Sequence, residues 1–145
     1  MTGKGDFTAE EWELVREGPP TAGIMVAFAS GGGSFRESWA LAKTFTEARQ
    51  KHGESELLDA IVAERPHIDR YHSREEAESE GLRQLGEAVG LLEQKATPDE
   101  LESYKQFTLD VAQRVAEAHK EQGAGVSPEE SQTIEKIRST FDASG

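Results

Sequence analysis

Apolar residues recur at helical spacing along most of this chain, with charged residues between them. The longest example spans residues 98–120, where apolar positions follow one another at intervals of three and four. This stripe consists of Leu101, Tyr104, Phe107 or Thr108, Val111, Ala112, Val115 and Ala118. Charged residues such as Glu102, Asp110 and Arg114 fall outside the stripe. The pattern predicts an amphipathic helix with one face in a core.

Three further segments show the same spacing. Their apolar positions are Phe35, Trp39, Ala42, Phe45 and Ala48 in residues 34–52, Leu57, Leu58, Ile61 and Val62 in residues 57–62, and Ile134, Ile137 and Phe141 near the end of the chain. We expect each set to pack inward, with the last helix covering the others.

Helix starts are marked by a Ser or Thr followed three residues later by Glu. In such a capping box the hydroxyl accepts from the backbone N–H of the Glu, whose carboxylate reaches back to the N–H of the cap. The boxes are Thr8/Glu11, Ser34/Glu37, Ser73/Glu76, Thr97/Glu100 and Ser127/Glu130. Phe7 and Trp12 flank the first box at the positions of a hydrophobic staple.

Gly and Pro predict where the helices end. Gly18, Pro19 and Pro20 follow one another, and proline removes a helical N–H donor, so we expect the first helix to stop there. Gly53, Pro66 and the glycines of residues 123–125 predict later ends.

Two segments depart from the simple amphipathic pattern. Residues 22–29 are apolar on every side, which predicts a central helix covered by its neighbours. Residues 73–95 contain Gly81, Gly86 and Gly90, and each glycine disfavours a helix unless it allows close packing. We expect that helix to pack closely on residues 22–29; the alternative is a break near Gly81 or Gly86.

These elements predict an all-α fold, a compact bundle of about six or seven helices in a single domain over residues 1–145. No sustained alternation of period two supports a sheet, apart from a short extended piece at residues 67–71. Residues 33–38 and 126–131 resemble each other. This echo is compatible with two pseudo-repeated helix-loop-helix halves, or simply with two capping boxes that each follow a glycine stop.

The charge of the chain narrows its expected partners. Its 28 acidic and 16 basic residues give a formal net charge of −12, which disfavours nucleic acid and anionic membranes. The chain has no cysteine, and we expect a cytoplasmic protein. The longest apolar run, residues 22–29, is too short to cross a bilayer, and residues 1–17 lack the apolar core of a signal peptide.

One segment resembles a metal site. His67, Asp69 and His72 could bind a divalent ion, because imidazole nitrogen and carboxylate oxygen suit zinc, manganese or iron. Their spacing does not align the ligands on one face of a helix, and Arg70 lies among them. The favoured interpretation is a solvated connector after Pro66, so we expect no cofactor, with a metal site as the alternative.

A second candidate is the loop formed by Gly31, Gly32 and Gly33 before Ser34. Free N–H groups at a helix start attract anions, so this loop is a candidate site for an anionic small ligand. No strand precedes the loop and no P-loop lysine follows it, so a flexible hinge between helices is the simpler interpretation.

The chain resembles a group of small, all-helical bacterial proteins of unknown activity. The resemblance rests on Phe7, Thr8, Trp12, Arg16 and Pro19, on the alanine-rich run into the glycines of residues 31–33, and on residues 115–118 and 126–130. The two glycine loops before Ser-x-x-Glu helix starts are similar to tellurite-resistance TerB-like domains, a resemblance that implies an all-helical fold with metal-binding acidic residues. Residues 30–33 and 122–125 lack the Asp-Gly pair of that family.

The sequence carries no reactive constellation of catalytic type; for example, no Gly-x-Ser-x-Gly elbow is present. It therefore favours a non-enzymatic helical binding or protein-interaction module, with a protein partner or a homodimer. The alternatives are a metal sensor or metal-dependent enzyme that uses His67, Asp69 and His72, and a sensor of anionic ligands that uses the loop of Gly31 to Gly33.

The two interpretations of residues 67–72 predict different responses to a chelator. If these residues form a solvated connector, the purified protein contains no stoichiometric metal, and its melting temperature is the same with and without chelator. His67→Ala and His72→Ala then melt like the wild type. Elemental analysis and thermal melts check this, and a chelator-sensitive melt that both variants abolish would establish the metal site instead.

Overall fold

The computed structural model describes residues 4–29, 35–50, 56–63, 73–120 and 128–144. In these ranges it has no strand and consists of one short 3-10 turn and six α-helices. The elements are η1 (Lys4–Asp6), α1 (Ala9–Ala29), α2 (Phe35–Gln50), α3 (Glu56–Val62), α4 (Arg74–Lys95), α5 (Pro98–Lys120) and α6 (Pro128–Ser144). The predicted all-α fold is confirmed. The extended piece expected at residues 67–71 lies outside the described ranges.

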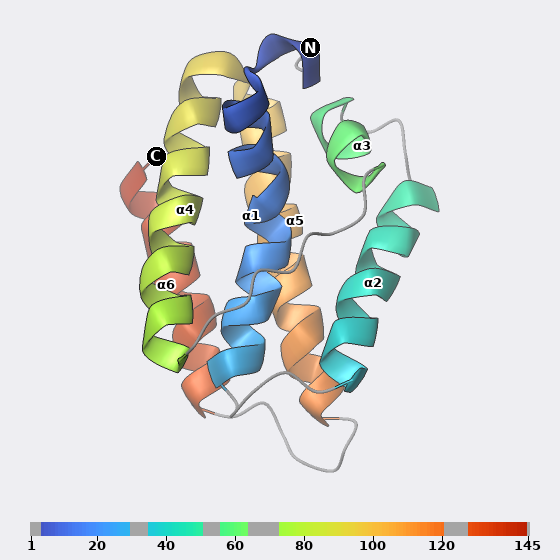
Figure 1. The fold of residues 1–145 in the computed structure, drawn as a ribbon, viewed down its shortest axis with the longest axis vertical. Coiled ribbons are helices and arrows are strands. Elements are labelled where there is room, and N and C mark those ends of the chain that lie inside the picture. The colour runs from blue at the N-terminus through green and yellow to red at the C-terminus, as the bar shows by residue number, and fades with distance from the viewer. Residues whose placement is uncertain (1–3, 30–34, 51–55, 64–72, 121–127, 145) are drawn as a thin grey trace.

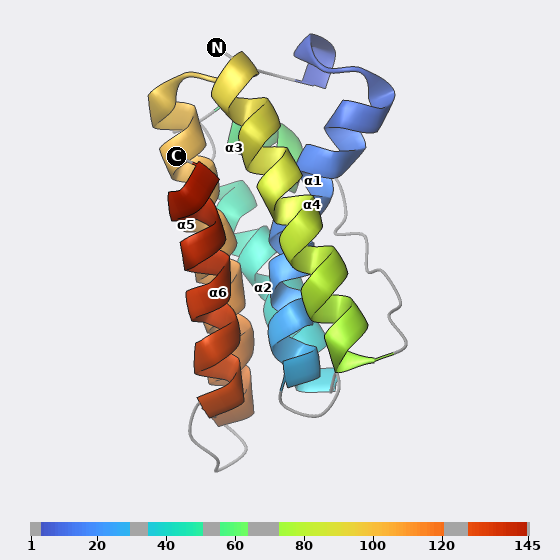
Figure 2. The same ribbon diagram turned by 90° about the vertical axis from the view of Figure 1, so that its left-hand side faces the viewer.

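Helix α1 lies at the centre of the bundle and contacts α2, α4, α5 and α6. Helices α4 and α5 lie beside it, α6 packs across α4 and α5, and α2 and α3 form an outer layer against α5 (Figures 1 and 2). Residues 22–27 are all buried, which confirms that this apolar segment is central, whereas Phe28 is only half-buried. Among the described helices, none combines the length and the apolar character that crossing a bilayer requires.

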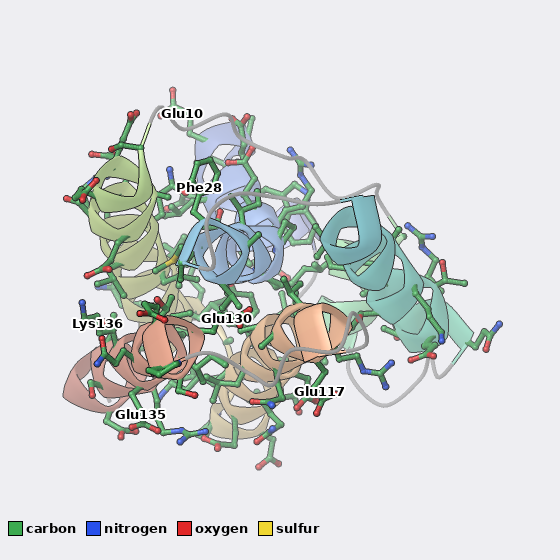
Figure 3. All side chains as sticks on the ribbon, turned by 90° about the horizontal axis from the view of Figure 1, so that it is seen from below. Glu10, Phe28, Glu117, Glu130, Glu135 and Lys136 are labelled. Carbon is green, nitrogen blue, oxygen red and sulfur yellow. The ribbon has the colours of Figure 1, made fainter. Side chains whose placement is uncertain are left out.

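The predicted apolar faces of α5 and α6 form much of the core. Tyr104, Val111 and Val115 of α5 are buried, and so are the apolar positions predicted for α6. Figure 3 shows Glu135 and Lys136 of α6 pointing away from the bundle, whereas Glu130 lies on its inner side. One hydrophobic cluster joins residues from all six helices.

Two of the predicted capping boxes form in full, and the hydroxyl of a third caps its helix as predicted. In the boxes of α1 and α5, Thr8 and Thr97 each accept from the backbone N–H of the Glu three residues on and receive its carboxylate in return. The Ser73 hydroxyl accepts from the backbone N–H of Glu76 at 3.0 Å. Ser34 and Ser127 lie outside the described residues, although α2 and α6 begin at the positions that follow them.

A lysine at the end of α4 fixes the start of α1. The rings of Phe7 and Trp12 lie 5.8 Å apart, which confirms the staple, and Lys95 Nζ lies 5.4 Å from the centre of the Phe7 ring. Lys95 also donates to the Glu11 carboxylate at 2.8 Å and to the Asp6 carbonyl at 3.1 Å. The side chain of Lys95 therefore holds the end of α4 against the start of α1.

The predicted end of the first helix at Gly18, Pro19 and Pro20 is wrong. Helix α1 continues through both prolines to Ala29, and Figure 2 shows that it bends partway along its length. Proline bends a helix because its nitrogen has no hydrogen for the carbonyl four residues earlier and its ring crowds that carbonyl. For Pro19 the affected carbonyl is that of Val15.

Tyr104 of α5 supplies the donor that Pro19 lacks. Its hydroxyl donates to the Val15 carbonyl at 2.8 Å, and the whole Tyr104 side chain is buried. Burial raises the pKa of the Tyr104 phenol, so the hydroxyl keeps its proton and can donate. A contact between two helices that are far apart in sequence therefore satisfies the carbonyl that local sequence leaves without a donor.

Two glycines allow α1 to approach its neighbours closely. A Cβ on Gly18 would overlap the Tyr104 hydroxyl, and a Cβ on Gly81 of α4 would overlap the Met25 side chain of α1. Helix α4 is continuous, so the predicted close packing occurs at Gly81 and the alternative of a break is wrong. A Cβ at Gly90, in contrast, would meet no atom within 4 Å.

The inward face predicted for α2 is partly wrong. Ala42 is exposed, while Leu41, Thr44 and Phe45 are buried. Helix α2 packs mainly against α5, and the large side chains of Leu41 and Phe45 determine which of its faces is buried. The small side chain of Ala42 would gain little from burial. The side chains of residues 35–40 lie outside the described ones.

We predict that Gly18→Ala and Tyr104→Phe are each destabilising, and that their effects are not additive. Removing the hydroxyl leaves a buried carbonyl without its donor, at a cost of about 1–3 kcal/mol. The Gly18→Ala methyl displaces the same hydroxyl, so the double variant should lose less stability than the sum of the single variants. Urea unfolding measures all three free energies of unfolding.

Gly90→Ala is the matched control for these measurements, because its methyl group enters open space. It should raise the free energy of unfolding by about 0.5–1 kcal/mol. Strict additivity of Gly18→Ala and Tyr104→Phe would contradict a shared role at the bend of α1.

The Lys95 contact predicts a pH-dependent stability. The hydrogen bond from Lys95, followed by that from the Thr8 backbone, lowers the pKa of Glu11 below its ordinary value of 4.5. A lowered folded-state pKa contributes stability above the ordinary value, and this contribution is lost as the pH falls through the folded-state pKa. The stability difference between wild type and Lys95→Met should therefore shrink below pH 4.5, in unfolding curves recorded across that range.

A residual difference should remain at low pH, because Lys95 also contacts Phe7 and the Asp6 carbonyl. In NMR titrations, the pKa of Glu11 should be higher in Lys95→Met than in the wild type. A stability difference that is constant with pH would argue against the carboxylate contact.

Candidate functional site

The two sites predicted from the sequence both lie outside the described residues. This holds for Gly31, Gly32, Gly33 and Ser34 of the glycine loop, and for His67, Asp69 and His72 of the candidate metal segment. Within the described ranges, no group of three or more His, Asp or Glu side chains is placed to hold a metal ion. Both predictions therefore remain predictions.

A pocket of about 300 Å³ lies where α2, α3 and α5 meet. In Figure 1, these helices are the cyan and green outer pair and the orange helix behind α1. The pocket is lined by Thr44, Glu47 and Ala48 of α2, by Leu58, Asp59 and Val62 of α3, and by Ser103, Gln106, Phe107, Asp110 and Arg114 of α5. Its volume is at the lower end of the range typical of small-molecule sites.

Helix α5 provides one wall because its lining residues recur at helical intervals. Ser103, Gln106, Phe107, Asp110 and Arg114 are separated by three, one, three and four positions, so they share one side of the helix. The Thr97 capping box and Pro98 begin this helix. One face of α5 therefore packs against α1, and another face lines the pocket.

The opposite wall is built from α2 and the short α3. The Arg49 side chain of α2 donates through Nε to the Val62 carbonyl at the end of α3. This hydrogen bond satisfies a carbonyl in the last turn of α3 and joins the two helices that line the pocket.

An ion pair joins α2 to α5 at the pocket. Arg114 donates to the Glu47 carboxylate, and both side chains are partly exposed. In the wild-type protein the guanidinium is therefore already neutralised by a carboxylate. A partly exposed pair of this kind contributes little to stability, so its main effect is on the charge of the pocket.

Asp110 has a neutral partner instead. Its carboxylate accepts from the Gln106 amide at 3.0 Å, one helical turn earlier on α5. No Lys, Arg or His of the described residues lies within ion-pair distance of Asp110. The Asp110 side chain is exposed, and among the described residues its hydrogen-bond partner, Gln106, carries no charge.

Four of the described lining residues are apolar. Val62 and Phe107 are buried, while Ala48 and Leu58 are half-buried. The rings of Phe107 and Phe45 lie 5.5 Å apart, so Phe107 is held against the core by an aromatic contact. The pocket thus combines these four apolar side chains with seven polar or charged ones, which suits a small ligand that has both characters.

Glu130 is a further buried carboxylate and lies in the first turn of α6. A negative charge in that turn is stabilised by the partial positive charge of the helix start. Its partner in the predicted capping box, Ser127, lies outside the described residues, so this capping role stays a prediction.

Comparison of this chain with protein-family models, with curated proteins and with solved structures finds no match. The resemblance to TerB-like domains therefore stays a prediction.

This pocket was not predicted from the sequence. Asp110 and Arg114 fall outside the apolar stripe of α5, which agrees with their exposure but does not show that they flank a cavity. The helical spacing of Ser103, Phe107 and Asp110 was the available signal. The contribution of Glu47 had no signal, because it depends on how α2 packs against α5.

Proposed function

We propose that this chain is a non-enzymatic binding module that takes a small organic molecule into the pocket between α2, α3 and α5. The observation that carries this proposal is a cavity of about 300 Å³ whose lining joins apolar side chains to convergent polar groups.

A small ligand fits this site better than an extended polymer. The pocket is confined between three helices, and the net charge of −12 repels polyanions from the whole molecule. Ser103, Gln106 and Asp110 supply hydrogen-bonding groups at its edge, and Leu58, Val62 and Phe107 supply apolar contact. The absence of cysteine agrees with a cytoplasmic location, which is part of this proposal.

A screen of small molecules against isotope-labelled protein by NMR tests the proposal. We expect compounds that bind to shift backbone amide signals of α2, α3 and α5 together. Ser103→Phe should fill the pocket and weaken these compounds about tenfold or more, because a bulky side chain would occupy their space.

Ser139→Phe is the matched control, since Ser139 is exposed on α6 and does not line the pocket. It should leave binding unchanged, and both variants should melt close to the wild type. A screen that finds no binder would contradict the proposal. Compounds whose affinity is unchanged by Ser103→Phe would also contradict it.

A further inference from the structure

We infer that the pocket between α2, α3 and α5 selects an organic cation that carries a short apolar chain, such as a protonated alkylamine. This inference rests on the proposed function, because it names the class of ligand for the same site. It is drawn from the charges at the edge of the pocket and from the apolar surface beneath them.

Among the described lining residues, Arg114 carries the only guanidinium, and this group is already paired. Arg114 contacts Glu47 across the boundary between α5 and α2. An anionic ligand would have to compete with this carboxylate for Arg114 and would leave Glu47 without its partner. The ion pair therefore acts against the binding of anions.

Asp110 provides the complementary charge for a cation. Its hydrogen bond from Gln106 holds the carboxylate in place without neutralising it. A ligand ammonium group at the edge of the pocket would make a charge-assisted hydrogen bond with Asp110.

The apolar part of the ligand has a separate place to bind. Leu58 and Val62 of α3 face the pocket together with Phe107 of α5. Binding of a short alkyl chain there is favourable because it removes apolar surface from water. The charged and apolar parts of the lining thus match the two ends of an alkylamine.

The net charge of the whole chain also favours the binding of cations over anions. With a net charge of −12, the surface attracts cations and repels anions over distances of about a Debye length, near 8–10 Å at ordinary salt. A test must therefore separate the effect of Asp110 on cation affinity from the effect of the net charge. A variant that removes one negative charge outside the pocket makes this separation.

The test compares three probes with the same chain length at pH 7: hexylamine, hexanol and hexanoate. NMR titrations should give affinities in the order hexylamine, hexanol, hexanoate, with the shifted signals in α2, α3 and α5. Asp110→Asn should weaken hexylamine about threefold to fivefold, as expected for a partly exposed ion pair, and should leave hexanol unchanged.

Asp142→Asn is the matched control, because it removes one negative charge from an exposed position on α6, outside the pocket. It should leave the hexylamine affinity close to that of the wild type. Asp110→Glu keeps the charge and should retain the preference for hexylamine, which also shows that position 110 tolerates substitution.

The possible failures are distinguishable. If hexanoate binds as tightly as hexylamine, or if Asp142→Asn weakens hexylamine as much as Asp110→Asn does, the inference is overturned while the proposed binding function stands. If none of the three probes binds, the inference is also overturned, and the small-molecule screen decides the proposed function independently.

Discussion

The hydrogen bond from the Tyr104 hydroxyl to the Val15 carbonyl holds the centre of this fold together. Two prolines in succession would normally end a helix, and a buried carbonyl without a donor is costly. Tyr104 provides the donor from a different helix, and Gly18 leaves the space that its hydroxyl occupies. Helix α1 can therefore run through the whole bundle as a single bent element, around which α4, α5 and α6 pack.

The position of α5 follows from this contact. Tyr104 fixes α5 against the bend of α1, and Gly23 lets Val111 and Val115 approach the next turns of α1 closely. Once this face of α5 is buried, the face that carries Asp110 and Arg114 must point toward α2 and α3. The same helix therefore stabilises the core and forms one wall of the pocket, so the geometry of the proposed site depends on contacts on the other side of α5.

The outer layer of α2 and α3 packs on the bundle mainly through α5, and polar contacts join its edges. Arg49 joins α3 to α2, and Glu47 joins α2 to Arg114 of α5. Such partly exposed polar contacts fix the orientation of the helices but add little to the free energy of unfolding. A ligand that bound between these helices would stabilise the described arrangement by mass action.

Local chemistry was sufficient to predict the helix starts, because the two partners of each capping box, such as Thr97 and Glu100, lie within one turn of each other. The apolar periodicity likewise predicted the buried faces of α5 and α6. The continuation of α1 past Gly18, the exposure of Ala42 and the existence of the pocket could not be predicted in this way. Each depends on which helix packs against which, and that choice is made by side chains distant in sequence, such as the hydroxyl of Tyr104, rather than by neighbours along the chain.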